Sequence, residues 1–337
     1  MERIKTWAAS IKLSRKQVCR NLAVFPLLAS DPGEPFFLTL DEALAQKAIS
    51  LTEKSSSGTV SELRLVNSQA KPVLILEGEE LMGAKQNRII NATFLIAGNT
   101  ELEIPVSCVE QGRWNYTSPE FRSGEKLMPA SLRQEHQVDL ACGLELGLGY
   151  RSNQGKIWNK IQQKSKRMKS ESDTGAMDIM FENHQDQLAD FSKTLRVIEL
   201  QVGAVFFING RPAGLDLFCF PDTWAKFFDK LVKSYALDAL DWMEDSVNPT
   251  VSPFMARRFL TAAMTSPGKG YPSVGLGENL RFDSRQVNGA ALIVQNQVLH
   301  LSAFSKNENR PGHESRPGGE AGYARFSKRR KNAIHGS

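Results

Sequence analysis

Two segments near the end of the sequence share one hairpin pattern, and this pattern strongly constrains the fold. Gly203–Phe218 reads GAVFFINGRPAGLDLF, and Gly289–Phe304 reads GAALIVQNQVLHLSAF. Each begins with Gly-Ala, runs through apolar residues to a two-residue turn, and ends in Phe. Asn209-Gly210 is a strong hairpin signal, because both central positions of a type I′ turn need a positive φ. We therefore expect two antiparallel hairpins.

A third segment, Val73–Gly83 (VLILEGEELMG), has a similar order of apolar run, turn and strand. The likeness has two explanations. The segments are either copies from an internal duplication or unrelated hairpins that share a short turn. If they are copies, Glu77-Gly78, Asn209-Gly210 and Gln295-Asn296 are equivalent turns.

The rest of the chain mixes short β-rich runs with segments of helical periodicity. Strands are expected at Asn21–Leu28, Ala48–Thr52, Ser61–Asn67, Pro72–Leu76, Gln86–Leu95 and Glu101–Glu110. Helices are expected at Leu38–Ala48 (opened by Thr39 or Asp41), Leu132–Cys142, Gly155–Met168, Ala176–Ser192, Asp222–Asp238 (capped by Asp222) and Pro253–Met264. These elements predict an α+β fold, with a β-rich, sandwich-like or rolled sheet core, a helical insertion and late β-hairpins.

We expect three parts. Residues 1–20 form an N-terminal helical extension, 21–304 one domain, and 305–337 a disordered basic tail. Within the domain, 21–118 is the β-rich half, 119–200 the helical part, and 201–304 the hairpins plus helices. The tail has eight Lys or Arg and three Glu, a charge of +5 that equals the net charge of the whole chain. The remainder is therefore formally neutral, and the tail suits only weak nucleic-acid contact that does not depend on base sequence.

Composition favours a soluble cytoplasmic protein that does not enter a membrane. Hydrophobic residues make up 41% of the chain, and no apolar run approaches the length of a membrane-spanning helix. The beginning of the chain has no apolar core of a secretory signal. The four cysteines are far apart and form no CxxC pair, which fits a reducing compartment better than a disulfide framework.

The first polar cluster, Glu77–Arg88, contains the strongest candidates for ligand binding: Lys85, Gln86, Asn87 and Arg88. Arginine offers a planar fork to a phosphate or carboxylate, and lysine a mobile point charge. The segment matches neither a Walker loop nor GxGxxG. It is therefore either a ligand site or a polar hairpin end whose charges pair with one another.

Glu80 and Glu110 are the candidates for acid–base catalysis, and no reaction follows from them. If Glu77–Leu81 is a strand, Glu77 and Glu79 share one face and Glu80 lies on the other. These acids then do not converge. The sequence also lacks DxD and HExxH, so no metal ligands are assigned, although a divalent cation stays an open alternative. Whether the protein is an enzyme is left open.

The second polar cluster, Cys108–Trp114, ends in Arg113 and Trp114. An arginine beside an aromatic ring can hold a planar ligand by stacking and charge. The alternative is a core tryptophan covered by an arginine stem. Cys108 has the pattern of a buried small residue, and His300 that of a strand histidine held by ordinary hydrogen bonds.

Several long motifs carry a family resemblance. They include GEELMGAKQNRIIN, IPVSCVEQGRW, FRSGEKLMPASLR, RSNQGKIW and QVGAVFFINGRPAGLDLF. With TGAM and YALDAL, they resemble the bacterial and archaeal ARPP-1 family, the ARG and rhodanese-phosphatase-superfamily-associated proteins. The likeness runs roughly from Asn21 to Phe304.

The resemblance implies a role beside ADP-ribosylglycohydrolases and rhodanese-phosphatase proteins, in bacterial stress, repair or conflict systems. One expectation is a protein that binds, and can process, an ADP-ribose-like or phosphorylated nucleotide. The other is a non-enzymatic module that recruits phosphatase or hydrolase partners. The resemblance supplies no cofactor and no proven site residue.

Overall fold

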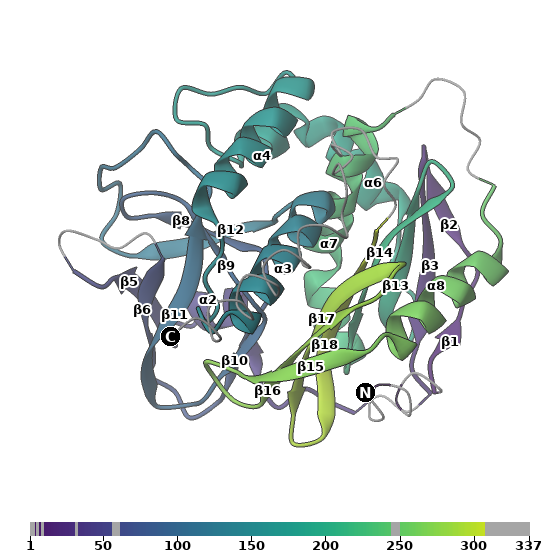
Figure 1. The fold of residues 1–337 in the computed structure, drawn as a ribbon, viewed down its shortest axis with the longest axis horizontal. Coiled ribbons are helices and arrows are strands. Elements are labelled where there is room, and N and C mark those ends of the chain that lie inside the picture. Colours follow the sequence, from purple (N-terminus) through teal and green to yellow (C-terminus); the bar gives the residue numbers. More distant parts are fainter. Residues whose placement is uncertain are drawn as a thin grey trace, which may run out of the picture. The chain divides into compact units, whose positions relative to one another are not determined.

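Short apolar strands and tight turns build three β-sheets in the computed structural model (Figure 1). It describes residues 10–30, 33–55, 61–243 and 250–306, together with Ile4 and Trp7. The chain divides into two units, Met1–Lys306 and Asn307–Ser337. The expected basic tail, apart from Ser305 and Lys306, lies outside the described residues. The first unit is a mixed, β-rich α+β protein, as expected.

The largest sheet has nine strands. In chain order they are β1 (Lys12–Leu13), β2 (Gln17–Cys19), β3 (Leu22–Leu28), β13 (Gln201–Ile208), β14 (Arg211–Phe218), β15 (Gly268–Pro272), β16 (Glu278–Asp283), β17 (Val287–Val294) and β18 (Gln297–Ser305). Their order in space is β1-β3-β13-β14-β18-β17-β16-β15, with β2 also paired to β3. Both late hairpins are confirmed, and they pair with each other through β14 and β18.

The two hairpins are related by an approximate two-fold axis. Their sequences align at an offset of 86 residues (289 − 203). In the sheet, Asp216 pairs with Ser302. These two residues occupy equivalent positions in the two hairpins, because their numbers also differ by 86. Gly214 pairs with Phe304, and the equivalent residues in the other hairpin, His300 and Phe218, also pair with each other. The axis therefore passes through the Asp216–Ser302 pair, and the register favours the duplication of these two hairpins.

The third segment is not a hairpin, so that part of the prediction is wrong. β7 (Val73–Ile75) and β8 (Glu79–Gly83) belong to different sheets. The backbone explains the difference. Both turn residues have positive φ at Asn209-Gly210 (49° and 75°) and at Gln295-Asn296 (47° and 69°), whereas only Gly78 does at Glu77-Gly78 (84°). Without a type I′ turn, the chain crosses from one sheet to the next.

Residues between β3 and β13 build the other two sheets. The three-stranded sheet has the order β10 (Phe94–Ile96), β7 and β4 (Leu38–Thr39). The six-stranded sheet, which is curled, has the order β12 (Phe121–Leu127), β8, β9 (Arg88–Ile90), β11 (Thr100–Cys108), β6 (Glu62–Asn67) and β5 (Ile49–Glu53). Five of the six strands expected in 21–118 have counterparts in these two sheets, and Asn21–Leu28 corresponds to β3 of the largest sheet. The single strand expected at Gln86–Leu95 is divided into β9 and β10, which belong to different sheets.

The helices also follow the predicted segments, although the one helix expected at Ala176–Ser192 is divided into two. They are α2 (Leu40–Ala45), α3 (Ala130–Glu145), α4 (Gln154–Arg167), α5 (Ile179–Asn183), α6 (Gln185–Thr194), α7 (Pro221–Asp241) and α8 (Pro253–Thr265). Thr39 caps α2 in a capping box, as expected. Asp222 does not cap α7. Phe220 takes the cap position without a side-chain bond, because Pro221 begins the helix with its fixed φ.

Two further expectations are wrong. Lys12–Leu13 and Gln17–Cys19 are strands rather than helix, because they fill the edge of the nine-stranded sheet by pairing with β3. β12 lies in the part expected to be helical. Its sequence, FRSGEKL, has little β-propensity, and its pairing with β8 decides its conformation.

Helices α3 and α7 pack on the inner face of the nine-stranded sheet, on the side of the curled sheet (Figure 1). Helix α8 packs on the outer face, where Ala256 and Phe259 join a second apolar core. A third core fills the inside of the curled sheet. The polar clusters of the sequence lie on and around the curled sheet.

Candidate functional site

The turn between β8 and β9 brings the first polar cluster together. Gly83 and Ala84 both have positive φ, 125° and 41°, and this bends the chain sharply before Lys85. The segment that follows the second cluster lies over the turn. Thr117 N donates to Ala84 O at 2.9 Å, and Ala84 N donates to Ser118 Oγ at 3.1 Å. The two clusters therefore form one site.

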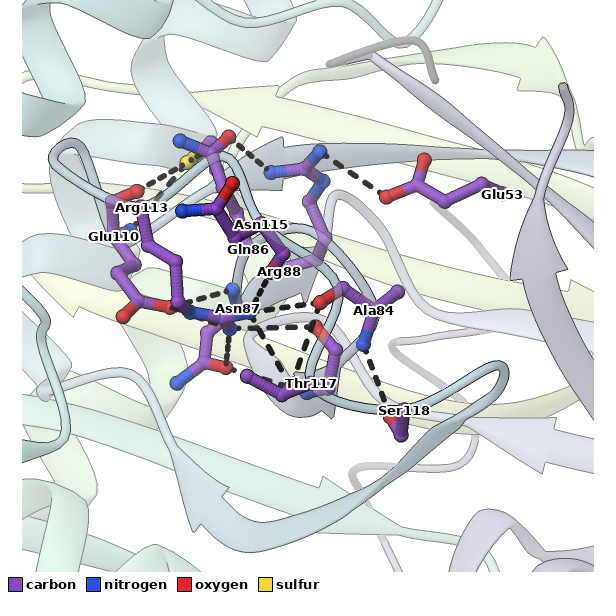
Figure 2. A network of polar contacts seen from close by, with 12 residues as sticks. Glu53, Ala84, Gln86, Asn87, Arg88, Glu110, Arg113, Asn115, Thr117 and Ser118 are labelled. Carbon is purple, nitrogen blue, oxygen red and sulfur yellow. Dashed lines mark hydrogen bonds and ion pairs between the residues drawn. The ribbon is translucent and has the colours of Figure 1, made fainter. Parts of the chain in front are cut away.

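Arg113 holds the two segments together (Figure 2). Its three nitrogens donate to Glu110 Oε2, Ala84 O, Asn115 O, Thr117 Oγ1, Gly83 O and Asn87 Oδ1, at 2.7 to 3.3 Å. These contacts take up the whole guanidinium. Arg113, expected to bind a ligand, is thus a positioning residue in this structure.

Glu110 is engaged in the same way. Its Oε2 accepts from Asn87 N at 3.0 Å and from Arg113 Nε at 2.9 Å. Asn87 in turn accepts from Arg113 through Oδ1. Glu110 and Asn87 therefore fix the loop through Glu110 Oε2 and Asn87 Oδ1.

Arg88 is fully buried at the start of β9. Its Nη1 donates to Gln86 Oε1 at 2.8 Å, and its Nη2 lies 3.7 Å from Glu53 Oε1. Neither Nε nor Nη2 has a hydrogen-bond partner among the described residues. The Sγ of Cys108 donates to the same Gln86 oxygen at 3.1 Å. Burial raises the pKa of Cys108, so the thiol form is favoured and a thiolate nucleophile is not.

Two aromatic rings form the exposed surface of the site. Lys85 Nζ lies 5.1 Å from the ring centroid of Trp114 and 5.2 Å from that of Tyr116. Arg88 lies beneath Trp114, with Cζ 5.8 Å from its centroid. Trp114 is 43% exposed and Tyr116 50%, although Lys85 between them is only 8% exposed. Trp114 is therefore not a core residue, and its ring is available for stacking.

Glu80 lies on the other face of β8. Leu81 pairs with Arg88 across the strands and Glu80 with Ile89, so Glu80 and Arg88 point to opposite sides. Burial raises the pKa of Glu80 to about 8, and the nearby carboxylate of Asp178 adds to this effect. Neither carboxyl oxygen has a hydrogen-bond partner among the described residues. Glu80 is thus predominantly protonated at neutral pH, but it is not part of the aromatic surface.

A search for related proteins gave one family. The model of the ARG and Rhodanese-Phosphatase-superfamily-associated Protein domain, ARPP-1, matches residues 10–304. The chain belongs to the ARPP-1 family. The match begins before Asn21, so it includes the edge strands β1 and β2. No curated protein and no solved structure matches the chain.

The three glutamates of the first polar cluster in this ARPP-1 domain face different partners. Glu79 pairs with Lys230 at 2.8 Å, whereas Glu77 faces Arg281 and His136. With Glu80 directed elsewhere, the three glutamates diverge. No group of three or more His, Cys, Asp or Glu side chains suited to a metal ion occurs in residues 10–30, 33–55, 61–243 and 250–306. Over the same ranges, no helix is long and apolar enough to cross a membrane.

Sequence reasoning missed two members of the site. Tyr116 follows Trp114 at a spacing of two, which places both rings over Lys85, and this WNY spacing was a usable signal. Glu53, which faces Arg88, had no local signal because it lies 35 positions earlier, on β5.

Proposed function

We propose that this ARPP-1 domain binds a phosphorylated nucleotide or an ADP-ribose-like molecule on the surface formed by Trp114, Tyr116 and Lys85. The observation that supports this most is the exposure of two aromatic rings on either side of a lysine ammonium group. A flat base stacks on such rings without regard to its identity. The lysine supplies the point charge that a phosphate needs.

The rigidity of the loop adds to this proposal. Arg113 ties residues 110–117 to the β8–β9 turn, so the rings are held in place before a ligand arrives. A preorganised site loses less conformational entropy on binding. The association recorded in the family description, with ARG and rhodanese-phosphatase proteins, is in keeping with a phosphorylated ligand. We assign no catalytic step, because Glu110 is held by the loop and Glu80 lies on the other face of β8.

Titration of the purified protein with ADP-ribose, ADP and adenosine tests the proposal. Thermal shift and tryptophan fluorescence report binding. Trp114→Ala should weaken the affinity for all three by about 5- to 150-fold, the equivalent of roughly 1–3 kcal/mol of stacking. Lys85→Ala should weaken the affinity for ADP and ADP-ribose but leave the affinity for adenosine nearly unchanged. Phe254→Ala is the control, because this ring is 72% exposed on α8, away from the site.

The same exposed rings suit a second function, the recruitment of a phosphatase or hydrolase protein. Aromatic residues are enriched at the centres of protein interfaces. If the wild-type protein binds no nucleotide at millimolar concentration, and Trp114→Ala abolishes co-purification of such a partner, ligand binding is wrong and recruitment is the function.

A further inference from the structure

A row of polar residues crosses the centre of the nine-stranded sheet, where apolar side chains are normal. Across neighbouring strands, Arg281 pairs with Ala290, Ala290 with Ser302, Ser302 with Asp216, and Asp216 with Ala204. All lie on the inner face, beneath α3 and α7. Ala290 lies between Ser302 and Arg281, and its small side chain takes up little of the space between the sheet and the helices.

Helix α3 faces this row with polar side chains. Arg133 and Gln137 are four residues apart, so they lie on one side of the helix. Arg133 makes a bidentate pair with Asp216, at 2.9 and 3.0 Å, and Gln137 Nε2 donates to Ser302 Oγ at 2.7 Å.

One half of this buried network is nearly complete, because Arg133 Nε is its one side-chain atom without a hydrogen-bond partner among the described residues. Besides Arg133, Asp216 accepts from Tyr235 Oη at 2.9 Å and lies 3.3 Å from His300 Nε2. His300 Nδ1 reaches Thr93 Oγ1 at 3.0 Å. Both ring nitrogens of His300 are thus satisfied, and this half of the network is a structural unit.

The other half, centred on Glu77, is incomplete. Arg281 Nη1 lies 3.4 Å and Gln137 Nε2 3.3 Å from Glu77 Oε2, and His136 Nδ1 is 3.8 Å from Glu77 Oε1, beyond hydrogen-bond length. Six atoms of these side chains have no hydrogen-bond partner among the described residues: Glu77 Oε1, His136 Nδ1 and Nε2, Gln137 Oε1, and Arg281 Nε and Nη2. All four residues are at most 5% exposed. Buried polar atoms are normally paired, so such a concentration marks a binding site.

The chemistry of these atoms specifies the ligand. Nε and Nη2 form one edge of the Arg281 guanidinium, the fork that binds two oxygens of an oxyanion. Glu77 Oε1 and Gln137 Oε1 only accept hydrogen bonds, so the ligand must also carry a hydroxyl. We propose that Glu77, His136, Gln137 and Arg281 bind a small oxyanion that retains a proton, such as monovalent phosphate. Arg133 and Arg281 balance Asp216 and Glu77, and His136 adds a ring nitrogen that can donate to an oxygen of the ligand.

His136 also lies on the route by which a ligand enters this site. It lines a crevice of about 10 Å³ between α3 and α4, room for about one water molecule. At the mouth, Lys156 pairs with Asp139 at 2.5 Å and Lys160 with Glu135 at 3.4 Å. These two ion pairs join the helices across the crevice. A ligand reaches His136 when they separate.

A comparison of phosphate with sulfate tests the proposal in the wild-type protein. Sulfate has the same tetrahedral shape as phosphate but carries no proton near neutral pH. It therefore has no hydroxyl to donate to the acceptor oxygens of Glu77 and Gln137. At equal ionic strength, phosphate should bind at least tenfold more tightly in calorimetry and should shift the imidazole NMR signals of His136. If the two anions stabilise the protein equally, or if neither shifts those signals at 50 mM, these residues hold only water and the proposal is wrong.

Two variants then locate the site. Glu77→Gln turns one acceptor into a possible donor, so the preference for phosphate over sulfate should fall at least tenfold. Arg281→Lys removes the forked guanidinium and should weaken the affinity for phosphate at least tenfold. Phe254→Ala, at an exposed ring on α8, should bind phosphate like the wild type. A loss of phosphate binding in Lys85→Ala, with none in Arg281→Lys, would place the anion at the aromatic surface and overturn the proposal. If both buried variants unfold, the wild-type comparison alone decides.

Discussion

At the residue scale, Glu80 contributes to the pH dependence of stability. An exposed glutamate has a pKa near 4.5, and burial raises that of Glu80 to about 8. Between these values Glu80 keeps a proton in the folded protein that it releases in the unfolded chain, so its contribution to the free energy of unfolding falls as pH rises from about 4.5 to 8. Glu80→Gln should therefore stabilise the protein at pH 8.5, on the order of 2–4 kcal/mol, and change little at pH 4. Urea unfolding at the two pH values measures this, with exposed Glu120→Gln as control. An equal change in the free energy of unfolding at both pH values would refute the raised pKa of Glu80.

The same scale shows what the sequence could reveal of the site. Lys85, Asn87 and Arg88 were identifiable because they are neighbours in the chain and together form an unusual run of polar residues. The role of Arg113 was not identifiable, because it depends on carbonyl oxygens of the β8–β9 turn, 29 or more positions away. Asp178, which acts on Glu80, comes from a loop far along the chain.

At the scale of elements, the turn between β13 and β14 depends on the positive φ of Gly210. Gly210 has a φ of 75°, and a Cβ built on it meets nothing within 4 Å. Gly210→Ala should therefore destabilise the protein by about 1–2 kcal/mol through backbone strain alone. Gly155→Ala is a matched control, since Gly155 lies in α4 without a positive φ and with space around it. Thermal unfolding of both variants checks this, and equal melting temperatures would contradict the strain argument.

The elements found and missed in the sequence differ in one physical respect. Hairpins and capped helices are set by neighbouring residues, such as Asn209-Gly210 and Thr39, so their pattern is local. β12 is a strand only because β8 lies beside it, and its register shift after Ser123 accommodates Glu80 against Gly124. β1 and β2 likewise exist because β3 offers them an edge.

At the scale of the whole molecule, the near-symmetric order of the nine-stranded sheet predicts its pattern of local stability. β14 and β18 lie at its centre, and β1 and β15 at its two edges. Amides of β14 and β18 should exchange with solvent most slowly, with protection falling toward both edges, because a central strand opens only when its neighbours do. Native-state hydrogen exchange measures this gradient. Exchange in β18 as fast as in β15 would show that the two halves of the sheet open separately.

The position of the long excursion between β3 and β13 has a consequence for synthesis on the ribosome. These strands are neighbours in the sheet, yet residues 29–200 separate them. At roughly 5–20 residues per second, β3 leaves the ribosome about 10–30 s before β13 exists. Throughout that interval, the apolar strand Leu22–Leu28 has no partner at the edge that β13 later covers. A chaperone that holds extended apolar segments has its opportunity to bind this nascent chain during those seconds.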